Sequence, residues 1–210
     1  SKFKPGYFET ETGKINFYSP FLAERNRTSH GINRAQYVPL TDGFEAILLT
    51  DGVQGPSGRT YTLQFITPHA KNRANSDYAN IPILQETDIQ SIYMNPVDAK
   101  MRGIQDQELA YMYTEVGCIY LPVKCTYSIP KGLVVVKQGA WYQPDETMIF
   151  PAWLDCNGKV EKYETPVDIG GCTNTLTRDL NSGIHDPFIN GMGLNAGGSA
   201  CEVSKTLPEG

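Results

Sequence analysis

The sequence lacks the features that mark several large classes of protein. No apolar run reaches the roughly 18 residues that cross a bilayer, and the N-terminus lacks the apolar core of a signal peptide. We therefore expect the chain as given to be soluble, with no direct membrane insertion. Basic excess is also absent, because 18 Lys and Arg stand against 23 Asp and Glu, a formal net charge of -5 at pH 7. That balance argues against a nucleic-acid partner, and any bound phosphate must be held locally.

Metal-binding and catalytic motifs are missing as well. The five cysteines occur without Cys-x-x-Cys spacing or close pairing with histidine, so no zinc site or iron–sulfur cluster can be read from their spacing. There is no Gly-x-Ser-x-Gly elbow, no His-Glu-x-x-His motif and no Walker loop, and the three histidines lie in separate segments. The odd cysteine count leaves at least one unpaired, so cysteine usage does not indicate a compartment.

Short apolar runs are abundant, and they are separated by 20 glycines and 14 prolines. The runs are rich in β-branched and aromatic residues and are bounded by turn residues, which is typical of β-strands. We predict strands at 45–49, 60–67, 91–95, 108–114, 118–127, 132–138 and 200–205. A hairpin turn at Gly117 separates two of them. This spacing indicates a compact β-barrel rather than a βαβ sheet.

One short helix is well marked between two of the predicted strands. Asn95 can cap its N-terminus, and Pro96 suits the first helical position. Asp98 falls in the first turn, while Arg102 followed by Gly103 is typical of a helix end. The helix is barely two turns long, so we expect it to be an insertion into the barrel.

Three polar loops follow predicted strands and contain the groups best suited to bind a ligand. They are 68–76, 139–146 and 170–179, and their glycines permit close backbone approach. We expect the strand ends after Thr67, Gln138 and Asp168 to cluster on one side of the domain. On composition alone, ordinary surface connections with Asn-rich turns are the favoured interpretation of these loops.

Several motifs, in order along the chain, resemble the C-terminal molybdopterin-dinucleotide-binding domain of the dimethyl sulfoxide reductase family. The most specific are "NPVDAKMRGI", "GAWYQPD" and "NTLT", and "TPHAKNRANS" resembles the catalytic subunits of anaerobic sulfoxide and N-oxide reductases. The resemblance implies a mainly β fold, a six-stranded double-psi β-barrel with short helical insertions. It assigns 61–210 to the barrel domain and 1–60 to a lead-in segment and hairpin region packed on it.

The resemblance also implies the cofactor, which is one molybdopterin guanine dinucleotide of a bis-MGD molybdenum centre. The implied contacts are Thr67, His69, Asn72, Arg73, Asn75, Ser76, Trp141, Tyr142 and Asn174. The planar fork of Arg73 suits a diphosphate, and the amide of Asn174 suits a pterin edge that offers donors and acceptors. The chain departs from many relatives at Asn75, where they have histidine, and at Ala200, where some have lysine.

By the same resemblance, the chain is the end of the catalytic subunit of a molybdenum sulfoxide or N-oxide reductase. It contains no catalytic residue and no metal ligand of its own, so the fragment alone should be inactive. The implied partners are the rest of that subunit, an iron–sulfur electron-transfer subunit and a membrane anchor subunit. The implied location is the periplasm or another extracytoplasmic membrane face.

Two other functions remain open from the residues themselves. A barrel of this kind could be a peptide- or protein-recognition module with an exposed groove. It could also be a small self-contained enzyme, for which Ser199 in "GGSAC" is the one weak candidate nucleophile.

Overall fold

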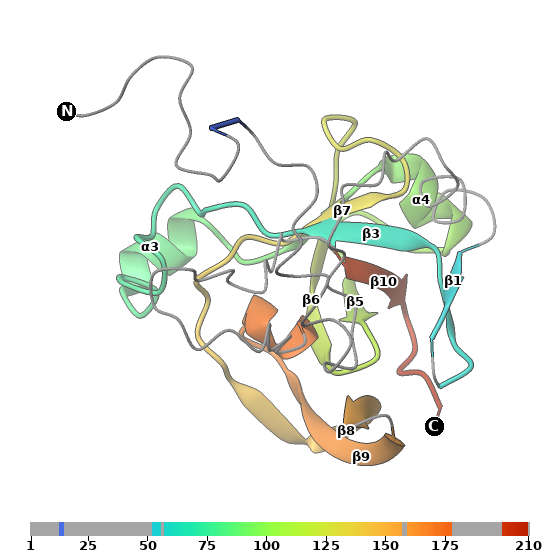
Figure 1. Ribbon diagram of the computed structural model, residues 1–210. Helices are drawn as coiled ribbons and strands as arrows, with labels where there is room; N and C mark the ends of the chain where they lie inside the picture. Colours follow the sequence, from blue (N-terminus) through green and yellow to red (C-terminus); the bar gives the residue numbers. More distant parts are fainter. Residues whose placement is uncertain (1–12, 15–51, 56, 157–158, 178–198, 210) are drawn as a thin grey trace. The chain divides into compact units, whose positions relative to one another are not determined.

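The computed structural model describes residues 13–14, 52–55, 57–156, 159–177 and 199–209 (Figure 1). The chain divides into two compact units, one made of 1–42 with 179–193 and the other of 43–178 with 194–210. Every described helix and strand belongs to the second unit. The expected strand at 45–49 lies outside the described residues, and the predicted domain boundary at residue 60 stays a prediction.

Six strands close into a barrel, which confirms the predicted mainly β fold. They are β3 (Leu63–Ile66), β4 (Ile92–Met94), β5 (Leu109–Tyr113), β6 (Cys118–Cys125), β7 (Leu133–Val135) and β10 (Ser199–Ser204). They pair in the order β4-β7-β3-β10-β5-β6, and β6 pairs back with β4. The β3–β7 and β4–β6 pairs are parallel, and the other four pairs are antiparallel.

Alternating side chains of these strands fill the barrel core. In β3, Leu63 and Phe65 are buried while Ile66 is exposed, and in β4 both Ile92 and Met94 are buried. The same period of two explains why short apolar runs in the sequence became strands, because each strand needs only two or three inward residues. Val134 of β7 is buried in the same core cluster.

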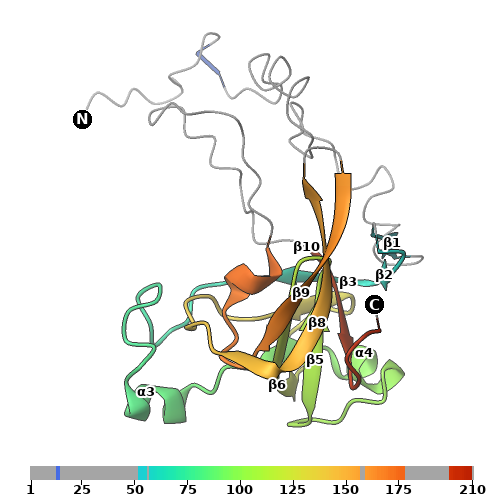
Figure 2. The same cartoon turned by 90° about the horizontal axis from the view of Figure 1, so that it is seen from below.

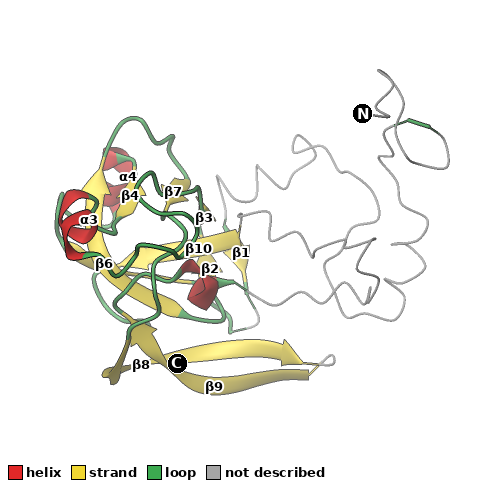
Figure 3. Ribbon diagram, turned by 90° about the vertical axis from the view of Figure 1, so that its left-hand side faces the viewer, coloured by secondary structure: helices red, strands yellow, loops and turns green. Residues whose placement is uncertain are grey.

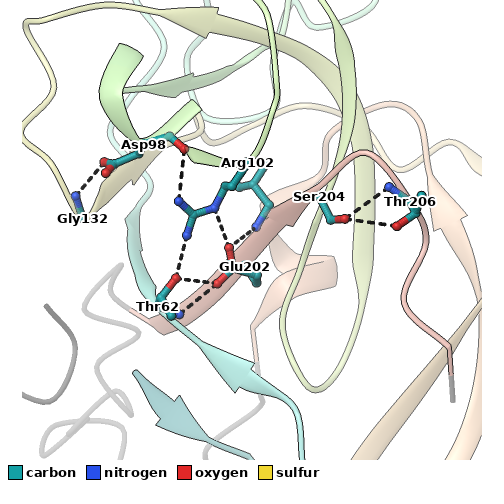
Figure 4. A network of polar contacts seen from close by, with 8 residues as sticks. Thr62, Asp98, Arg102, Gly132, Glu202, Ser204 and Thr206 are labelled. Atoms are coloured by element: carbon teal, nitrogen blue, oxygen red, sulfur yellow. Dashed lines mark hydrogen bonds and ion pairs between the residues drawn. The ribbon is translucent and has the colours of Figure 1, made fainter. Parts of the chain in front are cut away.

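The predicted helix is α4 (Pro96–Met101), and its end anchors the last barrel strand. Asn95 caps the helix, since its side chain accepts a hydrogen bond from the backbone N–H of Val97 at 3.0 Å. Just beyond the helix, Arg102 Nε lies 2.6 Å from Glu202 Oε1 of β10 (Figure 4). Arg102 Nη2 also donates to Thr62 Oγ1 at 2.6 Å, and that hydroxyl donates to Glu202 at 2.6 Å. These contacts join α4, the start of β3 and β10.

A long hairpin was not predicted. Strands β8 (Pro144–Cys156) and β9 (Lys159–Asp168) pair antiparallel and extend from the barrel (Figures 2 and 3). β9 joins the barrel through a parallel pairing with β6. Prolines in β8 and charged residues in β9 mask the strand pattern in the sequence.

The remaining described elements are short. They are β1 (Val53–Gln54), β2 (Thr60–Tyr61), the helix α3 (Pro82–Thr87) and the 3-10 helix η2 (Thr173–Leu176). The predicted strand at 60–67 is thus divided into β2 and β3. Within the described ranges, no helix has the length and apolar character to cross a bilayer.

The Arg102–Glu202 pair predicts a stability difference between two substitutions. Arg102→Met should lower the free energy of unfolding by about 2 kcal/mol, because it leaves a mostly buried carboxylate without its cation. Lys205→Met is the matched control, since the Lys205–Glu108 pair is more exposed, at 42% and 34%. The control should leave the free energy of unfolding nearly unchanged. Urea unfolding followed by circular dichroism measures both, and equal losses would contradict the anchoring role of Arg102.

Candidate functional site

Three loops meet on one side of the barrel, as the sequence predicted. We name them by the strand that precedes each: the β3 loop (67–76), the β7 loop (137–143) and the β9 loop (169–174). Trp141 Nε1 in the β7 loop donates to the backbone oxygen of Ser76 in the β3 loop at 2.8 Å. The convergence confirms that the strand ends after Thr67, Gln138 and Asp168 share one side.

Glycines allow these loops to touch through their backbones. Gly139 has φ of +89°, and a Cβ built on it would lie 1.7 Å from the backbone oxygen of Asn75. A Cβ on Gly170 would lie 2.2 Å from the backbone oxygen of Trp141. No other residue type fits either position without moving backbone, so the close approach depends on glycine.

A buried carboxylate at the end of β9 fixes two of the loops. Asp168 is 0% exposed, and its Oδ1 accepts hydrogen bonds from the backbone N–H groups of Gln143 and Gly170, each at 2.8 Å. Its Oδ2 accepts from the backbone N–H of Cys172 at 2.6 Å. The Asp168 side chain therefore holds both the β7 loop and the β9 loop in place. Backbone donors of this kind compensate the charge of a buried carboxylate.

Gln90 connects all three loops. Its Nε2 donates to the backbone oxygens of Lys137 at 2.6 Å and Gly171 at 3.1 Å. Its Oε1 accepts from Arg73 Nη2 of the β3 loop at 2.7 Å. One amide thus uses both its donor and its acceptor side to hold the three loops together.

The loops line an open cavity of about 470 Å³, and most of the predicted site residues lie along it. Six of the nine line it: Thr67, Asn75, Ser76, Trp141, Tyr142 and Asn174. Trp141 and Tyr142 are each 50% exposed, so their rings present a large apolar surface beside amide groups. Aromatic faces with a few amides and hydroxyls are typical of sites for small planar molecules.

The other predicted residues lie elsewhere. Asn72 and Arg73 line a neighbouring groove of about 630 Å³, which shares Ala140 and Trp141 with the cavity. His69 lines neither space, and its Nδ1 lies 2.7 Å from Gln138 Nε2. The structure therefore places His69 at the edge of the site.

The Arg73 side chain has an unpaired donor beside the groove. Its Nε is buried and has no hydrogen-bond partner among the described residues. Burial lowers the pKa of Arg73 from its ordinary value, while Asp88 and Tyr93 oppose that shift. A guanidinium remains charged at neutral pH even so, and a free donor on a cation suits an anionic ligand.

Sequence reasoning missed Asp168 and Gln90 as members of the site. Asp168 stands directly before "IGG", where a carboxylate often accepts N–H groups of a following turn, so a local signal existed. Gln90 carries no such signal, since its partners Arg73, Lys137 and Gly171 are 17 to 81 positions away.

Comparison with known proteins adds three findings. A family model described as "Molydopterin dinucleotide binding domain" matches residues 63–187. The chain is 32% identical over 169 residues to a putative dimethyl sulfoxide reductase chain, YnfE, of Escherichia coli, covering 80% of this chain and 19% of that protein. It is 28% identical over 173 residues to a trimethylamine-N-oxide reductase of Haemophilus influenzae, covering 81% and 18%.

A solved structure has a similar fold. Acetylene hydratase from Pelobacter acetylenicus matches with a TM-score of 0.54 and 16% identity, covering 96% of this chain and 26% of that one. The likeness to it is one of fold alone. The chain spans about a fifth of the length of the curated relatives it matches.

The Asp168 contacts predict a local loosening of two loops. Asp168→Asn has the same size but keeps a single acceptor oxygen, so one backbone N–H group would face an NH₂ donor. We expect a loss of about 1–3 kcal/mol of stability and faster amide exchange at 139–143 and 170–174. Hydrogen–deuterium exchange measures the second effect directly.

Asp98→Asn is the matched control for that substitution. Asp98 is also buried, at 7% exposure, but its carboxylate accepts one backbone N–H, from Gly132 at 2.7 Å. An asparagine can rotate its amide to accept that single bond, so exchange in the two loops should match the unsubstituted chain. Unchanged exchange in Asp168→Asn would remove Asp168 from the account of the site.

Proposed function

We propose a function from one premise, that the chain belongs to the molybdopterin dinucleotide-binding domain family. It is the cofactor-binding domain of a larger molybdenum oxidoreductase related to dimethyl sulfoxide and trimethylamine-N-oxide reductases. The observation that carries the proposal at the residue level is the convergence of three polar loops on one cavity, beside Arg73, whose buried Nε has no partner among the described residues.

The residues present fit molybdopterin guanine dinucleotide. The diphosphate calls for a cation with spare donors, and the buried Nε of Arg73 supplies one. The pterin ring calls for amide groups at its edge and an aromatic surface nearby, which Asn174 and Trp141 supply. The cavity and the adjoining groove, at about 470 and 630 Å³, fall within the range of small-molecule sites, about 300–1,000 Å³.

The domain's own part is to bind the dinucleotide and to orient its pterin ring. When bound, the molybdenum cofactor supplies the oxygen-atom transfer chemistry. Asp168 and Gln90 hold the three loops in place, so the loops need little rearrangement to receive the dinucleotide. Arg73 would neutralise phosphate charge, and Asn174 would fix the direction of the ring edge. No cluster of three or more possible metal ligands occurs in the described residues.

The activity that we propose for the whole protein is inferred from its relatives. The chain covers 18–19% of dimethyl sulfoxide reductase chains at 30–32% identity. We propose that it is the cofactor-binding part of the catalytic subunit of a sulfoxide or N-oxide reductase and docks on the rest of that subunit. An iron–sulfur electron-transfer subunit and a membrane anchor subunit complete the proposed assembly. Its proposed location is the periplasm or another extracytoplasmic membrane face.

Two substitutions should impair the full-length protein in different ways, one through cofactor occupancy and the other through activity per molybdenum. Arg73→Ala removes charge-assisted hydrogen bonds worth about 1.5–3 kcal/mol, so cofactor occupancy should fall about tenfold or more. Asn174→Asp keeps the size but replaces an amide donor with an acceptor-only carboxylate near the ring. Occupancy should largely survive while activity per molybdenum changes, because a negative charge is added close to the metal centre.

Molybdenum and guanine nucleotide content, measured beside activity per molybdenum, separates the two effects. Thr177→Val is a suitable control, because its hydroxyl contacts the backbone oxygen of Asn174 without lining either space. Full occupancy and unchanged activity per molybdenum in both site variants would mean that these loops are ordinary surface connections. The residue assignments would then have to be abandoned.

A further inference from the structure

Asp88, a carboxylate in the same groove as Arg73, is already paired with another cation. Asp88 lines the same groove as Arg73, and its charge opposes the effect of burial on the Arg73 pKa. Its Oδ1 nevertheless forms an ion pair with Lys137 of the β7 loop. The side chains of Lys137 and Asp88 are 22% and 15% exposed, so this pair is shielded from solvent.

Arg73, by contrast, has a neutral partner. Its Nη2 donates to the amide oxygen of Gln90 at 2.7 Å, and its Nε is unpaired within the described part of the chain. An arginine beside a free carboxylate would ordinarily form a two-pronged ion pair with it. Here Lys137 pairs with Oδ1 of Asp88, Oδ2 has no hydrogen-bond partner among the described residues, and no ion pair joins Asp88 to Arg73.

Lys137 is held both by its backbone and by the end of its side chain. Its backbone oxygen accepts from Gln90 Nε2 at 2.6 Å, and its Nζ lies 5.2 Å from the ring centroid of Tyr93. Burial on its own lowers the pKa of Lys137, but Asp88 and Tyr93 outweigh that effect and the pKa is raised overall. The ammonium is therefore held in its charged form beside Asp88.

We propose that Lys137 is a positioning residue for the anion site: by holding Asp88, it keeps Arg73 free to bind a phosphate of the dinucleotide. This inference rests on the proposed function. Without Lys137, Asp88 either pairs with Arg73 or remains as an uncompensated negative charge in the groove. Both outcomes weaken phosphate binding. In the first, Asp88 takes the hydrogen bonds of the guanidinium, and in the second, the Asp88 carboxylate repels the phosphate.

The test uses the full-length protein loaded with cofactor and then dialysed at 0.15 M salt. Retained molybdenum and guanine nucleotide per protein are measured for the unsubstituted protein, Lys137→Met, Asp88→Asn with Lys137→Met, and Arg73→Ala. Lys137→Met should retain about three- to tenfold less cofactor. The double substitution should recover most of that loss, because it removes the competing carboxylate together with its partner.

Lys124→Met is the matched control, because Lys124 Nζ also lies over the Tyr93 ring, at 5.5 Å, but is exposed and makes no ion pair with Asp88. It should retain cofactor normally. Recovery in the double substitution is the outcome that a merely structural role of Lys137 would not produce.

The possible failures point to different conclusions. Normal retention in Lys137→Met, with loss in Arg73→Ala, overturns the inference and leaves the proposed function standing. A loss in Lys137→Met that the double substitution does not recover also overturns it, since Lys137 would then act on the cofactor or the fold directly. Normal retention in Arg73→Ala would instead count against the assignment of Arg73 within the proposed function.

Discussion

The site depends on the burial of one carboxylate. Asp168 has no exposed surface, and its charge is compensated by the backbone N–H groups of Gln143, Gly170 and Cys172. A buried charge without such partners destabilises the fold. The β7 and β9 loops must therefore keep the conformation that supplies these partners. The rings of the β7 loop and the amide of Asn174 are consequently placed before any ligand arrives. Preorganisation of this kind lowers the free-energy cost of binding.

The barrel and the loops have separate tasks. The barrel closes through β10, the last strand in the sequence, which Glu202 fastens to Arg102 beyond the end of α4. The loops extend from strand ends that this closed framework holds together, and Gln90 links them across long sequence separations. The polar groups that hold the loops bond to one another, whereas the buried Arg73 Nε has no partner in the described part of the chain.

Sequence reasoning recovered the parts of this protein that depend on local patterns. The barrel strands were predictable because apolar residues alternate over short runs, and α4 was predictable from the Asn95 cap and Pro96. The β8–β9 hairpin was missed because Pro144 and Pro151 interrupt its strand pattern. Motif resemblance found six residues that the structure gathers around one cavity, yet the contacts that hold them, through Asp168 and Gln90, are set by tertiary packing that no local window records.

The central claim is that this domain holds a molybdopterin dinucleotide with the β3, β7 and β9 loops. The most direct measurement is an experimental structure of the full-length protein with its cofactor bound. The account predicts a phosphate oxygen within hydrogen-bonding distance of Arg73, about 3 Å, and a pterin edge at the same distance from the Asn174 amide. A bound cofactor that touches none of the three loops would contradict it.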